Sequence, residues 1–376
     1  MADQIFKPNI NVKILIWAIQ SAGWERKELI EKLKVNEDIY ERWINGSEKP
    51  TLRQLEAIGH RTKRPLASFF LPDIPKEKPL PKDYRLNLDK KDKFHRKTIL
   101  AIRKARTLQS ITKELSNNLY EESNLKIKNQ KINEPPKILA QEIRNKFELT
   151  EEKQRKFNNS YELFKFLREK LTDYNIFTFQ ISMPLEDARG FALSDDVPKT
   201  IVVNSGDLIE ARIFTLMHEF GHILLNDTGL DLPDLNDNNP VEKWCNNFAS
   251  GFLLPEDLAT RIFSENKNSL TDTKTLNTLS RKYKLSKSML LYNMLKLNFI
   301  SLNAYSEILE RYKKTEQINE SSRAGIPAEK RCISELGDKF ITLVAENTNK
   351  NHITYSDALN YLSIKSKNFN KLMKKI

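Results

Sequence analysis

The sequence predicts an α+β protein that is mostly helical, because its hydrophobic pattern has two different periods. Through most of the 376 residues, apolar side chains recur at the spacing of amphipathic helices. The runs 175–182, 188–194 and 199–204 are instead short, rich in β-branched and aromatic residues, and bounded by Pro, Asp or Asn. We therefore expect a small three-stranded sheet inside a helical chain.

Composition limits the class of protein. Hydrophobic residues make up 39% and charged residues 30%, as in globular proteins, and no apolar run is long enough to span a bilayer. The N-terminal segment lacks the apolar region of a signal peptide, and the two cysteines form no CxxC pair. These features favour a cytoplasmic location without membrane contact. The net charge of +12 indicates either an acidic partner such as DNA or simply a lysine-rich composition.

The pattern divides the chain into four parts. Residues 1–70 are typical of a helix-turn-helix domain. Short helices are predicted at 12–23, 25–35, 36–46 and 52–64, and tight turns join them. Residues 71–92, rich in proline and charge, are typical of a linker. Residues 93–265 form the predicted core, in which the sheet is combined with helices at 93–120, 136–172, 207–226 and 241–254. Residues 266–376 are expected to be a helical C-terminal region.

The strongest chemical signal is His218-Glu219-Phe220-Gly221-His222, which matches H-E-x-x-H inside a predicted helix. Residues four apart lie on one helix face, so both imidazoles can bind one Zn²⁺ ion. Glu219 can then act as the general base that accepts a proton from an attacking water molecule. Gly221, unusual within a helix, allows a neighbouring backbone to approach closely.

A catalytic zinc site needs a third protein ligand and one open position. Glu242, on the next predicted helix, is our first candidate, and Asn246 one turn later can hydrogen-bond a ligating histidine. The acidic run between the helices offers three competing ligands, Asp227, Asp231 and Asp234. Cys245 is interpreted as a small buried residue, because a fourth protein ligand would close the site. Tyr174 and Arg212 are candidates for stabilising an oxyanion, and Arg212 fits a structural ion pair equally well.

Three stretches together resemble the ImmA/IrrE family of metallopeptidases: RGFALSDDVPKTIVVNSGD, ARIFTLMHEFGHILLN and VEKWCNNFASGFLLP. The resemblance implies a zincin-like core in which the glutamate that opens the third motif, Glu242, is the third zinc ligand. The segments LIEKLKV, IYERWINGSEKPTLRQLEAI and KRPLASFFLP resemble the Xre-type helix-turn-helix domain that often precedes this peptidase. The helices beyond residue 270 resemble the family's C-terminal extension.

The resemblance also implies a function and partners. Family members typically cleave a regulatory protein, often a helix-turn-helix repressor or a toxin–antitoxin partner, and so relieve repression under stress. Extended substrates commonly pair with a sheet edge, and the strand Gly190, Phe191, Ala192, Leu193 and Ser194 is our candidate for that edge. DNA and a second copy of the chain, forming a homodimer, are the further partners considered.

The predicted DNA-reading helix of the N-terminal domain departs from the usual pattern. It begins with Asn36-Glu37-Asp38 and continues to Glu41, and acidic residues repel phosphate. Arg42 is its only basic residue and hence the candidate DNA contact. A helix-turn-helix domain retained for protein contacts is weighted equally with DNA binding.

Two rival interpretations remain. The first is a regulator or antitoxin that binds DNA or a toxin without proteolysis; the intact Glu219 argues against it, because a purely structural metal site needs no general base. The second is a protease that cleaves its own linker near 71–87, a segment whose composition suggests exposure.

Overall fold

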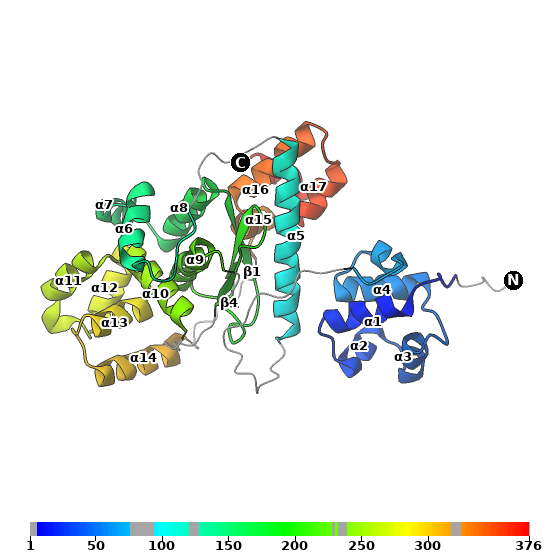
Figure 1. Cartoon of the computed structure of the whole chain (residues 1–376), viewed down its shortest axis with the longest axis horizontal. Helices are drawn as coiled ribbons and strands as arrows, with labels where there is room; N and C mark the ends of the chain where they lie inside the picture. Colours follow the sequence, from blue (N-terminus) through cyan, green and yellow to red (C-terminus); the bar gives the residue numbers. More distant parts are fainter. Residues whose placement is uncertain are drawn as a thin grey trace. The chain divides into compact units, whose positions relative to one another are not determined.

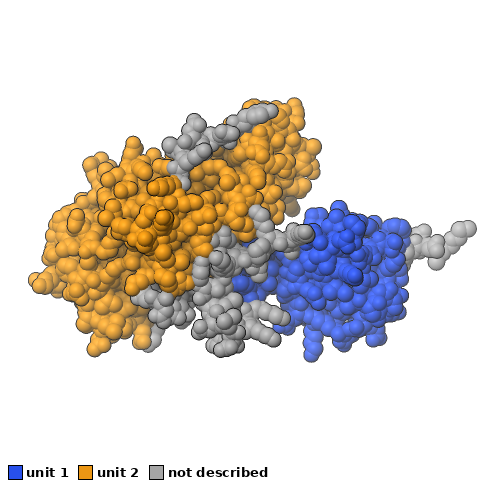
Figure 2. Space-filling model, in the orientation of Figure 1, with its two compact units in different colours: residues 1–80, 88–104 blue, residues 81–87, 105–376 orange. Residues whose placement is uncertain are grey.

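The computed structural model describes residues 6–75, 94–119, 128–227, 230–231, 239–316 and 325–375. The chain divides into two units, one formed by residues 1–80 and 88–104 and the other by residues 81–87 and 105–376 (Figure 2). Most of the predicted linker 71–92, including much of the segment 71–87, lies outside the described residues. The predicted boundary at residue 265 falls inside the second unit.

The first unit is a small helical bundle. Its elements are α1 (Val12–Ser21), α2 (Arg26–Leu33), α3 (Glu37–Ile44), α4 (Leu52–Thr62) and the 3₁₀ helix η1 (Leu66–Phe70). Each begins or ends as the local sequence dictates: the Asn36 side chain caps α3, and Thr51 with Gln54 forms a capping box on α4. Ile14, Trp43 and Phe69 lie in its buried core. The four helices expected from the sequence are therefore present in this unit.

After the N-terminal bundle, the described chain continues through α5 (Arg96–Asn118), α6 (Pro136–Lys146), α7 (Glu151–Lys156) and α8 (Ser160–Thr172) before the sheet begins. The predicted segment 136–172 is thus three helices. The breaks occur where Glu148 takes a left-handed conformation with φ of 55° and where Asn159 caps the start of α8.

The sheet consists of β1 (Ile176–Ile181), β2 (Gly190–Leu193), β3 (Lys199–Asn204) and β4 (Leu230–Asp231) in the order β1-β3-β2-β4. β1 is parallel to β3, and β2 is antiparallel to both of its neighbours. The three predicted strands are present, and the two-residue β4 is an addition that its sequence did not indicate. β4 pairs with Gly190 and Phe191, which corrects the expectation that these residues form an open edge.

α9 (Ile209–Leu224) packs against the sheet, and α10 (Pro240–Leu253) packs against α9 and α6 (Figure 1). The contact between α9 and α10 is filled by aromatic side chains, such as Phe220 against Phe248. The chain continues through α11 (Glu256–Glu265), η2 (Lys267–Ser269), α12 (Thr273–Tyr283), α13 (Lys287–Lys296) and α14 (Leu302–Glu316).

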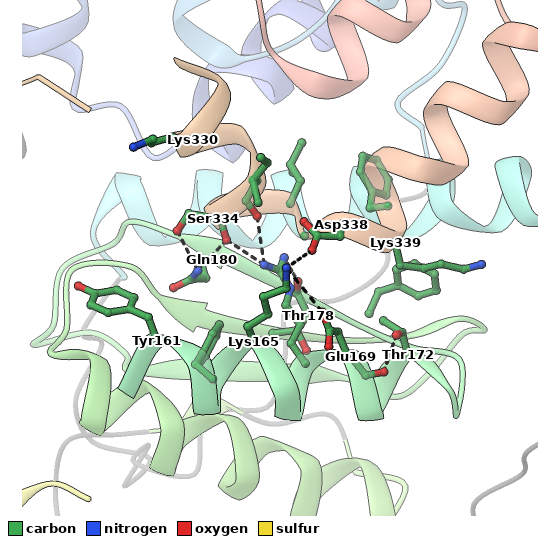
Figure 3. A pocket seen from close by; sticks show the side chains of 17 residues that line it. Tyr161, Lys165, Glu169, Thr172, Thr178, Gln180, Lys330, Ser334, Asp338 and Lys339 are labelled. Atoms are coloured by element: carbon green, nitrogen blue, oxygen red, sulfur yellow. Dashed lines mark hydrogen bonds and ion pairs between the residues drawn. The ribbon is translucent and has the colours of Figure 1, made fainter. Parts of the chain in front are cut away.

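The last helices are α15 (Ala328–Leu336), α16 (Asp338–Asn349), α17 (Tyr355–Leu362) and α18 (Ser366–Met373). α15 packs on β1, and a cavity lies between these two elements, α8 and α16 (Figure 3). None of the described helices combines the length and the apolar character that crossing a membrane requires.

Candidate metal centre

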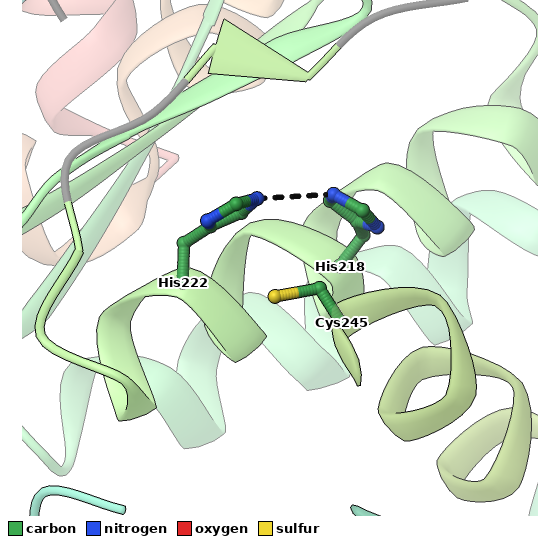
Figure 4. Close-up of side chains that lie close together, drawn as sticks. All are labelled: His218, His222 and Cys245. Carbon is green, nitrogen blue, oxygen red and sulfur yellow. Dashed lines mark hydrogen bonds between the residues drawn. The ribbon is translucent and has the colours of Figure 1, made fainter. Parts of the chain in front are cut away.

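Two histidines of α9 form the base of the site. His218 and His222 stand one helical turn apart, with exposed fractions of 1% and 0%. Their Nε2 atoms lie 3.2 Å from each other, and Figure 4 shows the two rings turned toward a common point. Apolar neighbours such as Met217 and Phe220 bury the rest of the helix. The helix therefore aims two nitrogen donors into a protected position.

Glu242 on α10 supplies a carboxylate to the same position. Its Oε2 lies 3.1 Å from Nε2 of His218, and its Oε1 lies 3.4 Å from Nε2 of His222. The close approach of α10 depends on Gly221, because a Cβ there would lie 3.0 Å from Sγ and 3.2 Å from Cα of Cys245. The role predicted for Gly221 is thus confirmed.

The donor atoms fit a zinc ion. Zinc bonds of about 2.0–2.1 Å at tetrahedral angles put nitrogen and oxygen donors about 3.3 Å apart. The separations of 3.1, 3.2 and 3.4 Å in this cluster match that value. In addition, Oε1 of Glu242 is buried without a hydrogen-bond partner among the described residues, which a cation would compensate.

Cys245 competes with Glu242 for the third position. Its Sγ and one nitrogen of each histidine all lie within 4.8 Å of one another (Figure 4). Tetrahedral zinc, with a Zn–S bond of about 2.3 Å, would require about 3.6 Å between sulfur and nitrogen. The carboxylate separations agree directly with tetrahedral zinc, so Glu242 is our preferred third donor and Cys245 is the alternative. Burial raises the pKa of the Cys245 thiol, which keeps it protonated at neutral pH.

The outer nitrogens of the histidines have oxygen partners. Nδ1 of His218 lies 2.9 Å from Oδ1 of Asn246, an acceptor that fixes the proton on Nδ1, so that Nε2 carries the lone pair that can bind a metal. Nδ1 of His222 lies 3.4 Å from Oδ2 of Asp227. Asp227, which the sequence offered as a ligand, therefore faces the outer nitrogen and orients the ring. The Asp231 side chain and Asp234 lie outside the described residues.

The electrostatics of the cluster favour a charged carboxylate. Burial raises the pKa of Glu242, but the close imidazoles of His218 and His222 outweigh burial and hold that pKa well below its usual range. Burial lowers the pKa of His222, yet Cys245, Asp227 and Glu242 together raise it above the usual value. Without a metal, His222 in these surroundings favours its protonated form, and a bound cation would take the place of that proton.

Glu219 lies beside the histidines and is fully buried. Its Oε1 is close to β2, since a Cβ on Gly190 would lie 3.2 Å from that oxygen and 2.5 Å from Cγ2 of Thr215. Gly190 is therefore the residue that lets the strand pass close to Glu219. Sequence reasoning proposed Gly190 as a substrate contact and did not foresee this packing role.

The other candidates are placed less directly. Phe191, Ala192 and Leu193 are completely buried and Ser194 is nearly so, which argues against the expectation that these residues meet a substrate. Arg212 donates from Nη1 to Oε1 of Gln180 at 2.8 Å and from Nε to the Asp207 carbonyl at 2.8 Å, as a structural residue does. Tyr174 stacks on Phe147 at 5.9 Å between ring centroids.

In the first unit, Arg42 is held by acidic neighbours. Its Nη1 lies 3.2 Å from Oε2 of Glu48, and its Nε donates to the Asp38 carbonyl at 3.3 Å. Glu37 and Glu41 both form ion pairs with Arg26. The proposed DNA contact is thus engaged within an acidic helix.

Comparison with known proteins agrees with this geometry. No curated protein matches the chain. Residues 171–295 match the sequence model of the family Peptidase_M78, described as the IrrE N-terminal-like domain, and this range contains α9, α10 and all the residues of the metal centre. This part of the chain is therefore similar to the IrrE N-terminal-like domain, which supports a metallopeptidase-type function.

Proposed function

We propose that the protein is a zinc-dependent endopeptidase that cleaves a partner regulatory protein, in particular a helix-turn-helix repressor, and so relieves repression under stress. The observation that carries the peptidase part is the meeting of His218, His222 and Glu242 at separations of 3.1–3.4 Å beside a buried Glu219. The choice of substrate rests on the resemblance to ImmA/IrrE peptidases.

Each residue has a distinct part in this chemistry. His218, His222 and Glu242 would hold the ion, and a bound zinc ion activates water and polarises the scissile carbonyl. Glu219 accepts the proton of the attacking water and passes it to the leaving amine. Asn246 and Asp227 orient the two imidazoles through their outer nitrogens. The buried surroundings strengthen all of these charge interactions.

The test is Glu219→Gln, which removes the base while keeping nearly the same volume. We expect zinc content and fold to stay unchanged and cleavage to fall by about 10²–10⁴-fold. Purified proteins encoded beside the gene serve as candidate substrates, with and without a chelator, and fragments are identified by mass spectrometry.

The matched control is Glu210→Gln. Glu210 lies in the first turn of the same helix, where it accepts a hydrogen bond from Ser160 Oγ at 2.6 Å and takes no part in the metal centre. This control should cleave at the wild-type rate. A Glu219→Gln protein that cleaves as fast as wild type, or whose cells respond to stress normally, would favour the non-proteolytic regulator or antitoxin instead.

A further inference from the structure

The same helix–turn–helix turn occurs at three places in the described chain, between α2 and α3, α12 and α13, and α17 and α18. Each turn has three residues, of which the first is left-handed: Lys34, Lys284 and Ser363, with φ of 55°, 57° and 52°. The second residue is apolar and donates its N–H to the carbonyl five positions earlier: Val35, Leu285 and Ile364, at 3.3, 3.1 and 3.1 Å. The C-terminal pair of helices is therefore built like the N-terminal one.

The second helices of these pairs differ in what they expose. α3 begins with the acidic residues Glu37 and Asp38. Half of α13 is buried, including Met289, Leu290 and Leu291. α18, in contrast, buries only Phe369 and Leu372 and contacts α15 through that side of the helix. α3 and α18 each bury only two residues, but the exposed surface of α3 is acidic, whereas that of α18 carries no acidic residue.

That exposed surface is basic. One exposed stripe runs along the helix, formed by Lys367, Asn370, Lys371 and Lys374. No acidic residue follows Asp357 in the sequence. Lys375 pairs with Glu329 at 3.0 Å, and Lys371 also interacts electrostatically with that carboxylate; within the described residues no ion pair is found for Lys367 or Lys374.

We propose that α17 and α18 form a helix-turn-helix that binds double-stranded DNA, with α18 in the major groove. In such motifs the second helix enters the groove and its polar residues meet base edges. The three lysines of the stripe, with Lys365 before the helix, contact phosphates and supply affinity. Asn370 is the residue on this stripe whose amide can pair with a base edge. This assignment replaces the acidic α3 as the DNA-reading element.

The experiment measures binding of the full chain to a fluorescein-labelled, mixed-sequence duplex by anisotropy, between about 50 and 200 mM salt. The variant is K367Q/K371Q/K374Q. Each phosphate contact contributes about 0.9 to the slope of log affinity against log salt, so we expect the slope to shrink by up to about 2.7. The fold is checked by circular dichroism, and the exposed positions make unfolding of the variant unexpected.

The matched control is K146Q/K267Q/K274Q, which removes the same charge from exposed lysines elsewhere in the second unit. Its slope of log affinity against log salt should stay within about 0.9 of the wild-type slope, the change expected from one phosphate contact. If both variants lost the same amount of DNA affinity, the binding would depend only on the total positive charge of the protein, and that would overturn the proposal. So would wild-type binding by the α18 variant, or binding to phosphatidylserine vesicles without binding to the duplex. None of these readouts depends on peptidase activity.

Discussion

Glu242 and Cys245 stand three residues apart on α10, and both approach the two imidazoles. The Glu242 oxygens lie 3.1 and 3.4 Å from the Nε2 atoms of His218 and His222, a separation at which all three side chains can bind one ion. The Cys245 thiol packs against Gly221. Glu242→Gln should therefore weaken zinc binding by at least about 10–100-fold, the loss that even outer partners of a metal site cause. Competition with a chromophoric chelator measures this.

Cys245→Ala is the discriminating companion variant, because it removes the other donor from the same helix. We expect its zinc affinity to stay within about threefold of wild type, since the Glu242 carboxylate already supplies a third donor at the separation that tetrahedral zinc requires. The reverse pattern, in which the alanine variant loses zinc and the glutamine variant keeps it, would make Cys245 the ligand.

At the residue scale, the sequence predicted those site residues whose positions follow from helical spacing. It did not predict contacts between residues that only the folded chain brings together. The positions of His218, Glu219 and His222 follow from helical periodicity, and Asn246 follows from the turn after Glu242. The orientation of His222 by Asp227 and the packing of Gly190 on Glu219 join residues that only the tertiary structure brings together. No local pattern specifies such contacts.

At the scale of elements, the long periodic segments were predictable and the interruptions were not. Helices 207–226 and 241–254 differ from α9 and α10 by one or two residues at each end. The break at Glu148 escaped detection because a left-handed glutamate has no sequence signature comparable to glycine. β4 escaped because two residues carry no period, and its existence depends on β2 as a partner.

α3 carries a prediction of its own. Its exposed Glu37 and Glu41 repel phosphate, and Arg42 is paired with Glu48. We expect the isolated N-terminal domain, residues 1–75, to bind duplex DNA weakly at most and to lose that binding as salt rises. Electrophoretic mobility shifts with a mixed-sequence duplex test this. Tight, sequence-selective binding at physiological salt would restore α3 as the DNA-reading helix.

At the scale of the whole second unit, one buried cation connects the C-terminal helices to the sheet. Arg168 on α8 is 8% exposed and donates to the carbonyls of Ser334 at 2.9 Å and Glu335 at 3.1 Å, near the end of α15. It also donates to the Thr178 carbonyl of β1. A cation at the C-terminus of a helix is favourable, so this contact stabilises α15 while fixing it to the sheet. Burial lowers the pKa of Arg168 to about 10, which still leaves it charged at neutral pH.

Gln180 extends this connection toward the metal centre. It donates from Nε2 to the Ser334 carbonyl at 2.6 Å and accepts from Arg212 of α9 at 2.8 Å. The C-terminal helices are thus joined through β1 to the helix that carries both histidines. Figure 3 shows Gln180 and Ser334 facing each other across this junction. The predicted region 266–376 is in this respect part of the support of the site.

Arg168→Met tests how much this connection stabilises the fold. The substitution keeps an unbranched apolar chain but leaves buried carbonyls of α15 and β1 without their donor, and each such group costs about 1–3 kcal/mol. We expect the free energy of unfolding to fall by about 2–4 kcal/mol, measured by urea denaturation. The control is Lys165→Met on the same helix, whose ion pair with Asp338 at 2.7 Å is largely exposed and contributes at most about 1 kcal/mol. Equal losses in the two variants would show that Arg168 acts as an ordinary surface charge, and the C-terminal helices would then be held to the sheet by apolar packing alone.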